Sequence, residues 1–227
     1  MQILYEDNHL LAVVKPCGLA TMGLAEGEET LLTRSKEYIK QKYNKPGAVY
    51  LGVVSRLDVP VSGVVLFART SKAAARLNEQ FRTHSVEKIY VALVEGLVDP
   101  PEGEWIDWIC EDERHRKVWL TREGQGKEAK LQYCTLHKTN NNYKTNNNSL
   151  VEIHLETGRK HQIRVQFAGH GFPIFGDRKY GAETIFPEGI ALHALRLTVT
   201  HPTTQQRIVL MAPIPVIWKK FTEKSLL

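Results

Sequence analysis

The chain has 227 residues, of which 42% are hydrophobic and 24% are charged. These values are ordinary for a folded globular protein and exclude a disordered or collagen-like chain. The formal net charge of +5 at pH 7 suits a polyanionic partner such as a nucleic acid, although it does not require one.

The cysteines and the N-terminal residues indicate the compartment. Cys17, Cys110 and Cys134 are widely spaced and form no C-x-x-C pair, which argues against a disulfide framework or a zinc site. Residues 1–9 are acidic and polar where a signal peptide would be basic and then apolar. No apolar run approaches the roughly 20 residues that span a bilayer. We therefore expect a cytoplasmic protein without membrane association.

Apolar periodicity predicts many strands and few helices. Strands are expected at residues 3–5, 10–15, 48–54, 64–68, 88–96, 105–109, 117–120, 131–137, 150–156, 190–200 and 207–212. Helices are expected at residues 31–43 after an N-cap at Thr30, from Thr70 or Ser71 to about residue 84, within and after residues 157–165, and at 216–221. The Asn-rich residues 139–148 predict a mobile hairpin tip.

The order of these elements predicts the fold class. Strands and helices do not alternate regularly, which favours α+β with a largely antiparallel or mixed central sheet and flanking helices and loops. We expect one domain over residues 1–227, made of two closely joined halves at about 1–98 and 99–227. The polar residues 99–126 are interpreted as the connection between them. No separate N-terminal module is expected.

A polar loop at residues 54–63 contains the first candidate for chemistry. It lies between two apolar runs, and a loop held between rigid strands can aim one carboxylate with little conformational freedom. Asp58 is that carboxylate. The sequence Asp-Val-Pro-Val-Ser-Gly is also good turn chemistry, so on local grounds a plain structural turn is the favoured interpretation.

Two further segments carry candidate residues. Strand alternation places Lys88 and Tyr90 on one face, and residues 157–165 run from a turn into a helix with a strongly basic opening. No phosphate-cradling loop or dinucleotide fingerprint is present. His193 and His201 make no metal spacing with each other or with a cysteine. We therefore expect no metal and no nucleotide cofactor.

Six groups of short segments, in order, carry a resemblance that covers nearly the whole chain. They are ILYED (3–7) with VKPCGL (14–19), SRLD (55–58) with SG (62–63), KIY (88–90), TGRKHQIR (157–164), GD (176–177) with YG (180–181), and LHA (192–194) with HP (201–202). With these segments the chain resembles the RluA-like family of RNA pseudouridine synthases. The resemblance implies the pseudouridine synthase catalytic fold and an isomerase that acts on uridines of structured rRNA or tRNA.

The resemblance also implies roles for individual residues. Asp58 is the nucleophile or base beside the ribose, and the two roles stay open. Arg164 is the cation that keeps this carboxylate ionised, and Tyr90 stacks on the target uracil. The residues expected to contact RNA are Arg56, Lys88, Arg159, Lys160, His161 and Gln162. His161 and Gln162 are also interpreted as supports behind the site. We expect a monomer without cofactor.

The chain departs from the family pattern at three positions, and the first two motivate an alternative. Ser55 and Val61 stand where the family usually has His and Thr, and Gln166 stands where His is common. The alternative is a catalytically weakened RNA-binding protein that keeps the fold. A second alternative, a carboxylate-dependent glycosidase, needs two working acids. Its visible second acid is Asp177, which we expect to cap or brace its loop instead.

Overall fold

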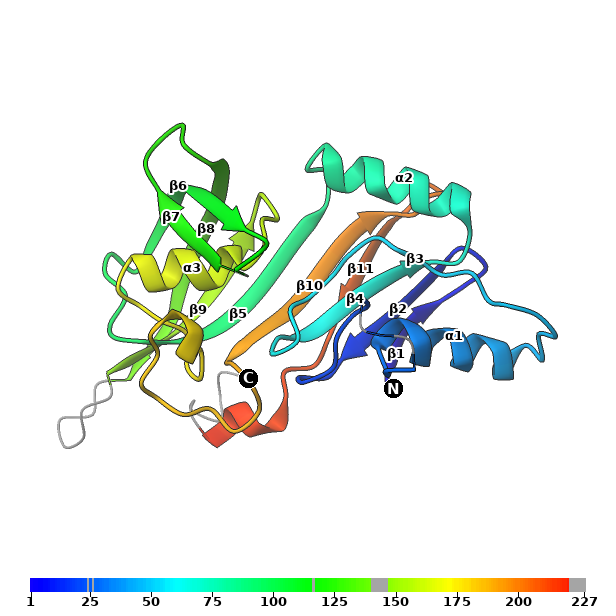
Figure 1. Ribbon diagram of the computed structural model, residues 1–227, viewed down its shortest axis with the longest axis horizontal. Coiled ribbons are helices and arrows are strands. Elements are labelled where there is room, and N and C mark those ends of the chain that lie inside the picture. Colours follow the sequence, from blue (N-terminus) through cyan, green and yellow to red (C-terminus); the bar gives the residue numbers. More distant parts are fainter. Residues whose placement is uncertain (24, 26, 116, 140–146, 221–227) are drawn as a thin grey trace. The chain divides into compact units, whose positions relative to one another are not determined.

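The structure is a computed structural model that describes residues 1–227 except 24, 26, 116, 140–146 and 221–227 (Figure 1). Its elements fall into two units. The first comprises Met1–Glu87 and Ala194–Pro213, and the second comprises Lys88–His193 and Ile214–Leu227. This division differs from the predicted halves at residues 1–98 and 99–227, because the chain returns to the first unit at Ala194.

The first unit is a sheet with a helix on each face. Its elements are β1 (Ile3–Glu6), β2 (Leu10–Lys15), α1 (Leu31–Lys42), β3 (Gly52–Val53), β4 (Ser62–Ala68), α2 (Ser71–Arg82), β10 (Leu192–Thr200, from its third residue on) and β11 (Arg207–Met211). The strands lie in the order β1-β2-β4-β10, with β3 beside β4 and β11 beside β10. The pairs β1/β2, β2/β4, β3/β4 and β10/β11 are antiparallel.

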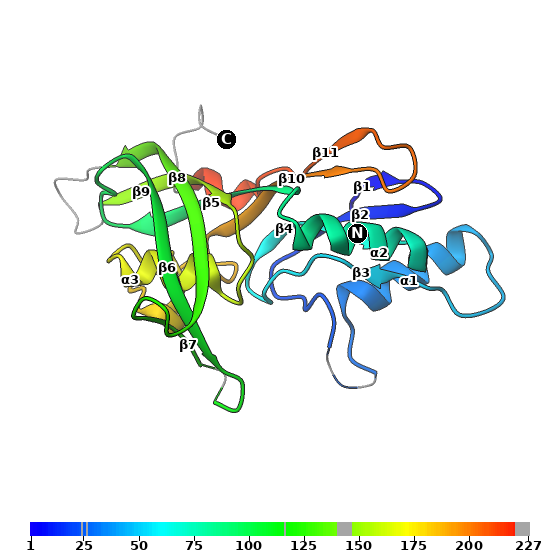
Figure 2. The same cartoon turned by 90° about the horizontal axis from the view of Figure 1, so that it is seen from above.

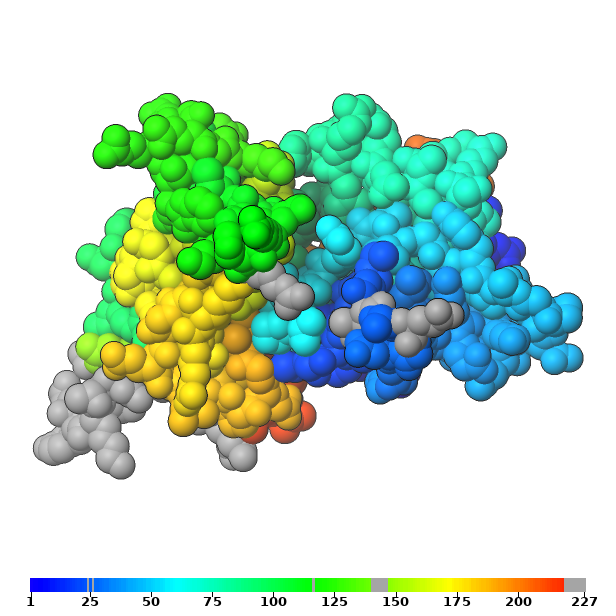
Figure 3. All heavy atoms as spheres, viewed as in Figure 1, coloured from blue at the N-terminus to red at the C-terminus, as the bar shows by residue number. Residues whose placement is uncertain are grey.

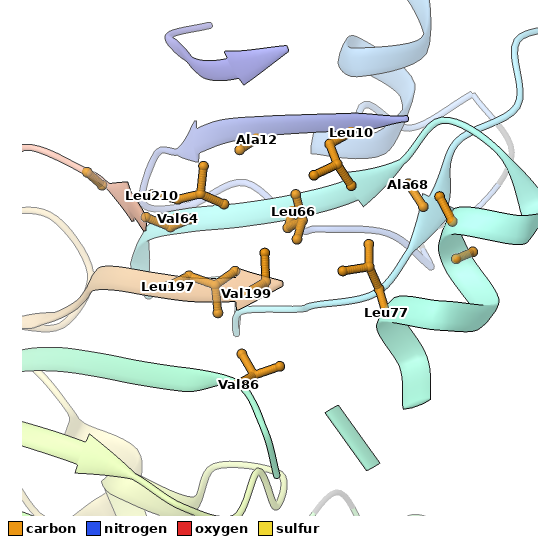
Figure 4. Close-up of a cluster of buried hydrophobic side chains, with 13 residues drawn as sticks. Leu10, Ala12, Val64, Leu66, Ala68, Leu77, Val86, Leu197, Val199 and Leu210 are labelled. Atoms are coloured by element: carbon orange, nitrogen blue, oxygen red, sulfur yellow. The ribbon is translucent and has the colours of Figure 1, made fainter. Parts of the chain in front are cut away.

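Both faces of β2 and β4 are buried, which explains their continuous apolar sequences. On one face, Leu10 and Leu66 pack in the same cluster as Leu77 of α2 (Figure 4). On the other face, Leu11 and Phe67 pack with residues of α1. The backbone between them is thereby held between two apolar layers. A loop that leaves this part of the sheet starts from a rigid base.

Local capping signals fix the start of both helices in this unit. Thr33 N–H donates to Thr30 Oγ1 over 3.1 Å, and Thr30 N–H donates back to Thr33 Oγ1 over 2.8 Å. Thr70 Oγ1 accepts from Ala73 N–H over 3.1 Å at the start of α2. The predicted N-cap at Thr30 and the predicted start of the second helix are confirmed.

The second unit is a sheet with α3 packed on it, as Figure 2 shows. Its elements are β5 (Glu87–Glu95), β6 (Glu102–Asp112), β7 (Lys117–Thr121), β8 (Lys127–Thr139), β9 (Asn148–Leu155), α3 (Gln162–Gly169) and the 3-10 helices η1 (Arg178–Tyr180) and η2 (Val216–Lys220). The strands lie in the order β5-β9-β8-β6-β7, with antiparallel pairs throughout this order. The predicted α+β class with a largely antiparallel or mixed sheet is confirmed.

The structure differs from two local predictions, and a third falls mostly on residues that it does not describe. Residues 99–126 are not a connection, because they form the long strand β6 and the short strand β7. Their polar sequence follows from one solvated sheet face. Residues 48–54 form a strand only at Gly52–Val53, and the apolar side chains of this run pack in the same cluster as residues of α1. The hairpin tip predicted at residues 139–148 lies mostly outside the described residues.

Gly63 in β4 lies against the backbone of Ala194 in β10 with no room for a side chain. Its φ is +124°, and a Cβ added there would lie 2.3 Å from the carbonyl oxygen of Ala194 and 2.5 Å from its nitrogen. Backbone atoms cannot yield as a flexible side chain can. We therefore expect Gly63→Ala to lower the free energy of unfolding by on the order of 3 kcal/mol, measured by urea denaturation.

Gly124 provides the matched control for this variant. Its φ is +76°, and an added Cβ would meet nothing within 4 Å. Gly124→Ala keeps the left-handed strain without the collision and should cost about 1 kcal/mol. Equal costs for the two variants would show that the contact with Ala194 is not the cause.

Candidate active site

Asp58 lies half-buried in the loop between β3 and β4. Its carbonyl accepts a hydrogen bond from Val61 N–H over 3.1 Å, which closes a tight turn through Val59 and Pro60. The turn that the local sequence predicts is therefore present. The turn and the candidate carboxylate are the same element, so the structural interpretation does not exclude the functional one.

The segment after β2 fastens this turn from the side. Thr21 Oγ1 donates to the Leu57 carbonyl over 3.0 Å and accepts from Leu57 N–H over 3.2 Å. Gly18 N–H and Lys15 Nζ both donate to the Val59 carbonyl, over 2.9 and 3.1 Å. With the thiol of Cys17 on the next carbonyl, the four carbonyls of residues 57–60 all accept a hydrogen bond. The backbone around Asp58 is therefore fixed residue by residue.

Two of the three departures from the family pattern belong to this framework. Ser55 Oγ accepts from Leu66 N–H over 2.9 Å and so ties the start of the loop to β4. Val61 is 3% exposed and belongs to the core. Both side chains therefore stabilise the position of the turn in this chain.

Lys15 is a buried cation that the sequence did not single out as a site residue. Its side chain is fully buried, and Nζ donates to the carbonyls of Pro16, Leu19 and Val59 over 3.0, 2.7 and 3.1 Å. Burial lowers the pKa of Lys15 to about 8, against smaller and opposing electrostatic effects of Cys17 and Asp58. A lysine that closes an apolar strand gives no sequence signal of burial, because that position is ordinarily solvated.

This pKa predicts a pH dependence of stability. The folded pKa of Lys15 lies below its ordinary value of 10.5, so between about pH 8 and 10.5 the unfolded chain binds more protons. Stability from this group therefore rises with pH through that window. Relative to Lys15→Met, the wild-type free energy of unfolding should rise by on the order of 3 kcal/mol. Parallel denaturation curves at pH 7.5, 9 and 10 measure it, and a constant difference would contradict the prediction.

In the second unit, α3 holds Arg164 in a buried ion pair. Arg164 Nε donates to Asp177 Oδ2 over 2.7 Å, and Nη2 donates to Oδ1 over 2.9 Å. The two side chains are only 6% and 2% exposed. The ring of Tyr180 lies against the guanidinium, 5.1 Å from its carbon. The prediction that Asp177 braces its loop is confirmed, although its partner is Arg164 and its side chain caps no helix.

Tyr90 and Lys88 lie on β5, where Tyr90 is half-buried and the alternate residue Ile89 is fully covered. Lys88 Nζ donates to the carbonyls of Glu156 and Thr157 over 3.0 and 3.2 Å. Burial and the neighbouring positive charge of Arg159 lower the pKa of Lys88 to about 8. Lys88 therefore holds the turn that leads into α3, and its contact with RNA stays a prediction.

The basic turn before α3 divides into exposed and internal side chains. Arg159 and Lys160 are exposed, and Figure 3 shows the segment around α3 (yellow) at the surface. Arg159 Nε donates to the carbonyl of Glu128 over 2.8 Å, and Lys160 pairs with Glu111. Gln162 is 2% exposed and accepts from Thr157 Oγ1 over 2.7 Å.

The candidate residues are thus distributed over both units. The exposed Arg56 and the half-buried Asp58 belong to the first unit, and the other candidates belong to the second. Within the second unit, the structure brings both Arg164 and His161 to Tyr180, Arg164 to its ring and His161 to its hydroxyl. The prediction that Arg164 keeps Asp58 ionised concerns residues of different units and stays a prediction.

Among the described residues, no group of three or more His, Cys, Asp or Glu side chains is arranged to hold a metal ion. In the same part of the chain, none of the helices has the length and hydropathy of a membrane span. The candidate residues carry carboxylate, guanidinium and phenol groups.

Comparisons with known proteins identify the family. The model of the RNA pseudouridylate synthase family matches residues 9–169. The dual-specificity RNA pseudouridine synthase RluA of Escherichia coli (strain K12) is 35% identical over 217 residues, which cover 93% of this chain and 92% of that protein. The tRNA pseudouridine synthase C of Haemophilus ducreyi is 34% identical over 236 residues, which cover 96% and 93%.

A solved structure agrees with this assignment. The human RNA pseudouridylate synthase domain containing 4 is 25% identical and superimposes with a TM-score of 0.77, covering 96% of this chain and 90% of that one. The two relatives and this structure each match more than 90% of the chain. The chain therefore belongs to the RluA-like family of RNA pseudouridine synthases.

Proposed function

We propose that this protein converts specific uridines of structured rRNA or tRNA to pseudouridine, with Asp58 as the reacting carboxylate. Its family makes it an isomerase that acts on uridine in RNA. The observation that carries the role of Asp58 is the fully hydrogen-bonded turn, in which all four carbonyls of residues 57–60 are occupied. Such a turn holds a reactive side chain in one geometry.

The reaction needs a carboxylate but no redox partner. The bond between uracil N1 and ribose C1′ breaks, the base turns, and a bond forms between C5 and C1′. N1 gains a proton and C5 loses one, so the atoms of uridine and pseudouridine balance. Asp58 acts on the ribose as nucleophile or as base.

Arg164 and Tyr90 complete the proposed chemistry. A carboxylate that reacts beside the ribose needs an opposing cation, because a nearby positive charge favours the charged form of an acid. We assign Arg164 to that role, with its own position held by Asp177. We assign Tyr90 to stack on the extruded uracil, a contact worth roughly 1–3 kcal/mol per base.

RNA binding in this proposal relies on backbone contacts. Arg56, Arg159 and Lys160 are exposed and would neutralise phosphates around the extruded uridine without reading bases. We assign Lys88 and Gln162 to hold the shape of the turn that carries Arg159 and Lys160. The protein in this proposal acts as a cytoplasmic monomer and needs no nucleotide cofactor.

The two alternatives have less support. The binding-only alternative was motivated by Ser55 and Val61, and both contribute to the framework of the Asp58 loop. A glycosidase would need Asp177 as a second acid. Both oxygens of Asp177 accept from Arg164 in a buried pair, so this carboxylate is poorly placed to exchange protons with a sugar.

The test of the function is site-resolved sequencing of pseudouridine. RNA from cells with and without the gene is treated with carbodiimide, which marks pseudouridine, and the marked positions are mapped. We expect discrete rRNA or tRNA positions to lose the mark, and the purified protein to restore it on RNA from the deletion strain. Unchanged maps together with no conversion by the purified protein would contradict the proposal.

A further inference from the structure

Arg164 is connected through Tyr180 to His161, and the proposed chemistry does not use this connection. Asp177 bonds one edge of its guanidinium, and the ring of Tyr180 lies against it. The hydroxyl of Tyr180 shares a hydrogen bond of 2.7 Å with His161 Nδ1, and the two rings meet edge to face. The contacts therefore form a chain from His161 through Tyr180 to Arg164.

We propose that His161 and Tyr180 are positioning residues that fix the plane of the Arg164 guanidinium. This inference rests on the proposed role of Arg164. Asp177 restrains the guanidinium within its own plane, whereas an aromatic ring beside it restrains rotation out of that plane. The hydrogen bond to His161 keeps the ring from swinging away. Together the contacts define both position and tilt.

The backbone at His161 supports this assignment. His161 has φ +54° and ψ +19°, a left-handed conformation that is unfavourable for a residue with a side chain. It occupies the N-cap of α3, yet its side chain makes no capping bond. The side chain bonds Tyr180 instead. A strained residue whose side chain reaches a partner nineteen residues ahead is explained by that contact.

The loop after α3 is built to supply both partners of Arg164. Asp177 and Tyr180 are three residues apart, at the two ends of the η1 turn. The carbonyl of Asp177 accepts from Tyr180 N–H over 2.9 Å and from Ala182 N–H over 3.2 Å. These bonds fix the spacing between carboxylate and ring. One short loop thus contacts the Arg164 guanidinium with both the carboxylate of Asp177 and the ring of Tyr180.

Two substitutions separate the contact from the backbone strain. His161→Gly removes the imidazole and suits the left-handed backbone, and Tyr180→Phe removes only the hydroxyl. We expect each to lower kcat about tenfold, because small displacements of a charged group in a site are costly. The KM for RNA should stay within about twofold and the melting temperature within a few degrees, since the ring and the buried pair remain.

A rescue variant and a double variant make the test specific. Asn tolerates the left-handed region, and its side-chain amide can replace Nδ1 as a hydrogen-bonding group. His161→Asn should therefore recover most of kcat. The double variant His161→Gly/Tyr180→Phe should lose no more than either single variant, because one hydrogen bond is removed in all three.

The result that overturns the inference is wild-type kcat in His161→Gly or Tyr180→Phe. A change confined to KM would also overturn it and would assign these residues to RNA contact. Asp58→Asn is measured in parallel. If Asp58→Asn stays active, the proposed function fails; if Asp58→Asn is inactive while the His161 and Tyr180 variants are normal, this inference alone fails.

Discussion

Asp177→Asn is expected to lower the free energy of unfolding by about 3–5 kcal/mol, because it leaves the charge of Arg164 without its buried partner. The pair is bidentate, and its side chains are 6% and 2% exposed. For a chain of this size the loss corresponds to a fall in melting temperature of roughly 6–20 °C. Thermal and urea denaturation of the purified variants measure it.

An exposed ion pair is the control for this prediction. Glu79 and Arg82 are paired on the surface of α2, with side chains 54% and 73% exposed. Glu79→Gln should leave the free energy of unfolding close to that of the wild type, because solvent screens such pairs. A loss of less than about 1 kcal/mol in Asp177→Asn would show that the buried pair contributes little to stability.

A double substitution separates stability from function at the same place. Replacing both partners of a buried pair with apolar residues is often neutral or stabilising, since neither charge then remains buried. Arg164→Met/Asp177→Leu should therefore recover most of the stability lost in Asp177→Asn. It should not recover uridine conversion, because the proposed chemistry needs the guanidinium. Recovered conversion would remove Arg164 from the mechanism.

Local signals explain which parts of the fold could be predicted from the sequence. Thr30 and Thr70 are capping residues followed by apolar residues at helical spacing, so α1 and α2 were predictable with their starts. The continuous apolar runs of β2 and β4 were predictable for a similar reason. β6 was missed as a long strand because its outward residues, such as Glu102 and Glu104, are polar and exposed.

The candidate residues likewise include features that local sequence predicts and contacts that it does not. The turn at Asp58 could be predicted from its own residues. The hydrogen bond from Val61 N–H to the Asp58 carbonyl confirms this turn. Its fastening by Lys15 and Thr21 depends on contacts 36 to 44 residues apart in sequence. No local pattern encodes such contacts. The pairing of Arg164 with Asp177 likewise follows from how the loop after α3 folds back.

Asp58→Asn should abolish conversion of uridine while the protein stays folded. The substitution removes the charge and keeps the size of a half-buried side chain. The bonds that fix the turn use main-chain carbonyls and therefore remain. We expect RNA binding within about threefold of wild type and a rate of conversion lower by at least about 10³-fold, as for the loss of a reacting group in other enzymes.

Asp112 provides a matched control for that variant. It is a half-buried aspartate at the end of β6, bonded to His115, and it has no role in the proposed chemistry. Asp112→Asn should convert uridine at close to the wild-type rate. A comparable loss in both variants would indicate a general effect of removing a carboxylate.

The most direct measurement is the single-turnover rate of pseudouridine formation on RNA from the deletion strain, with wild type, Asp58→Asn and Asp112→Asn compared at saturating protein. The account predicts product with wild type and Asp112→Asn, and no detectable product with a folded, RNA-bound Asp58→Asn. Conversion by Asp58→Asn at the wild-type rate would contradict it.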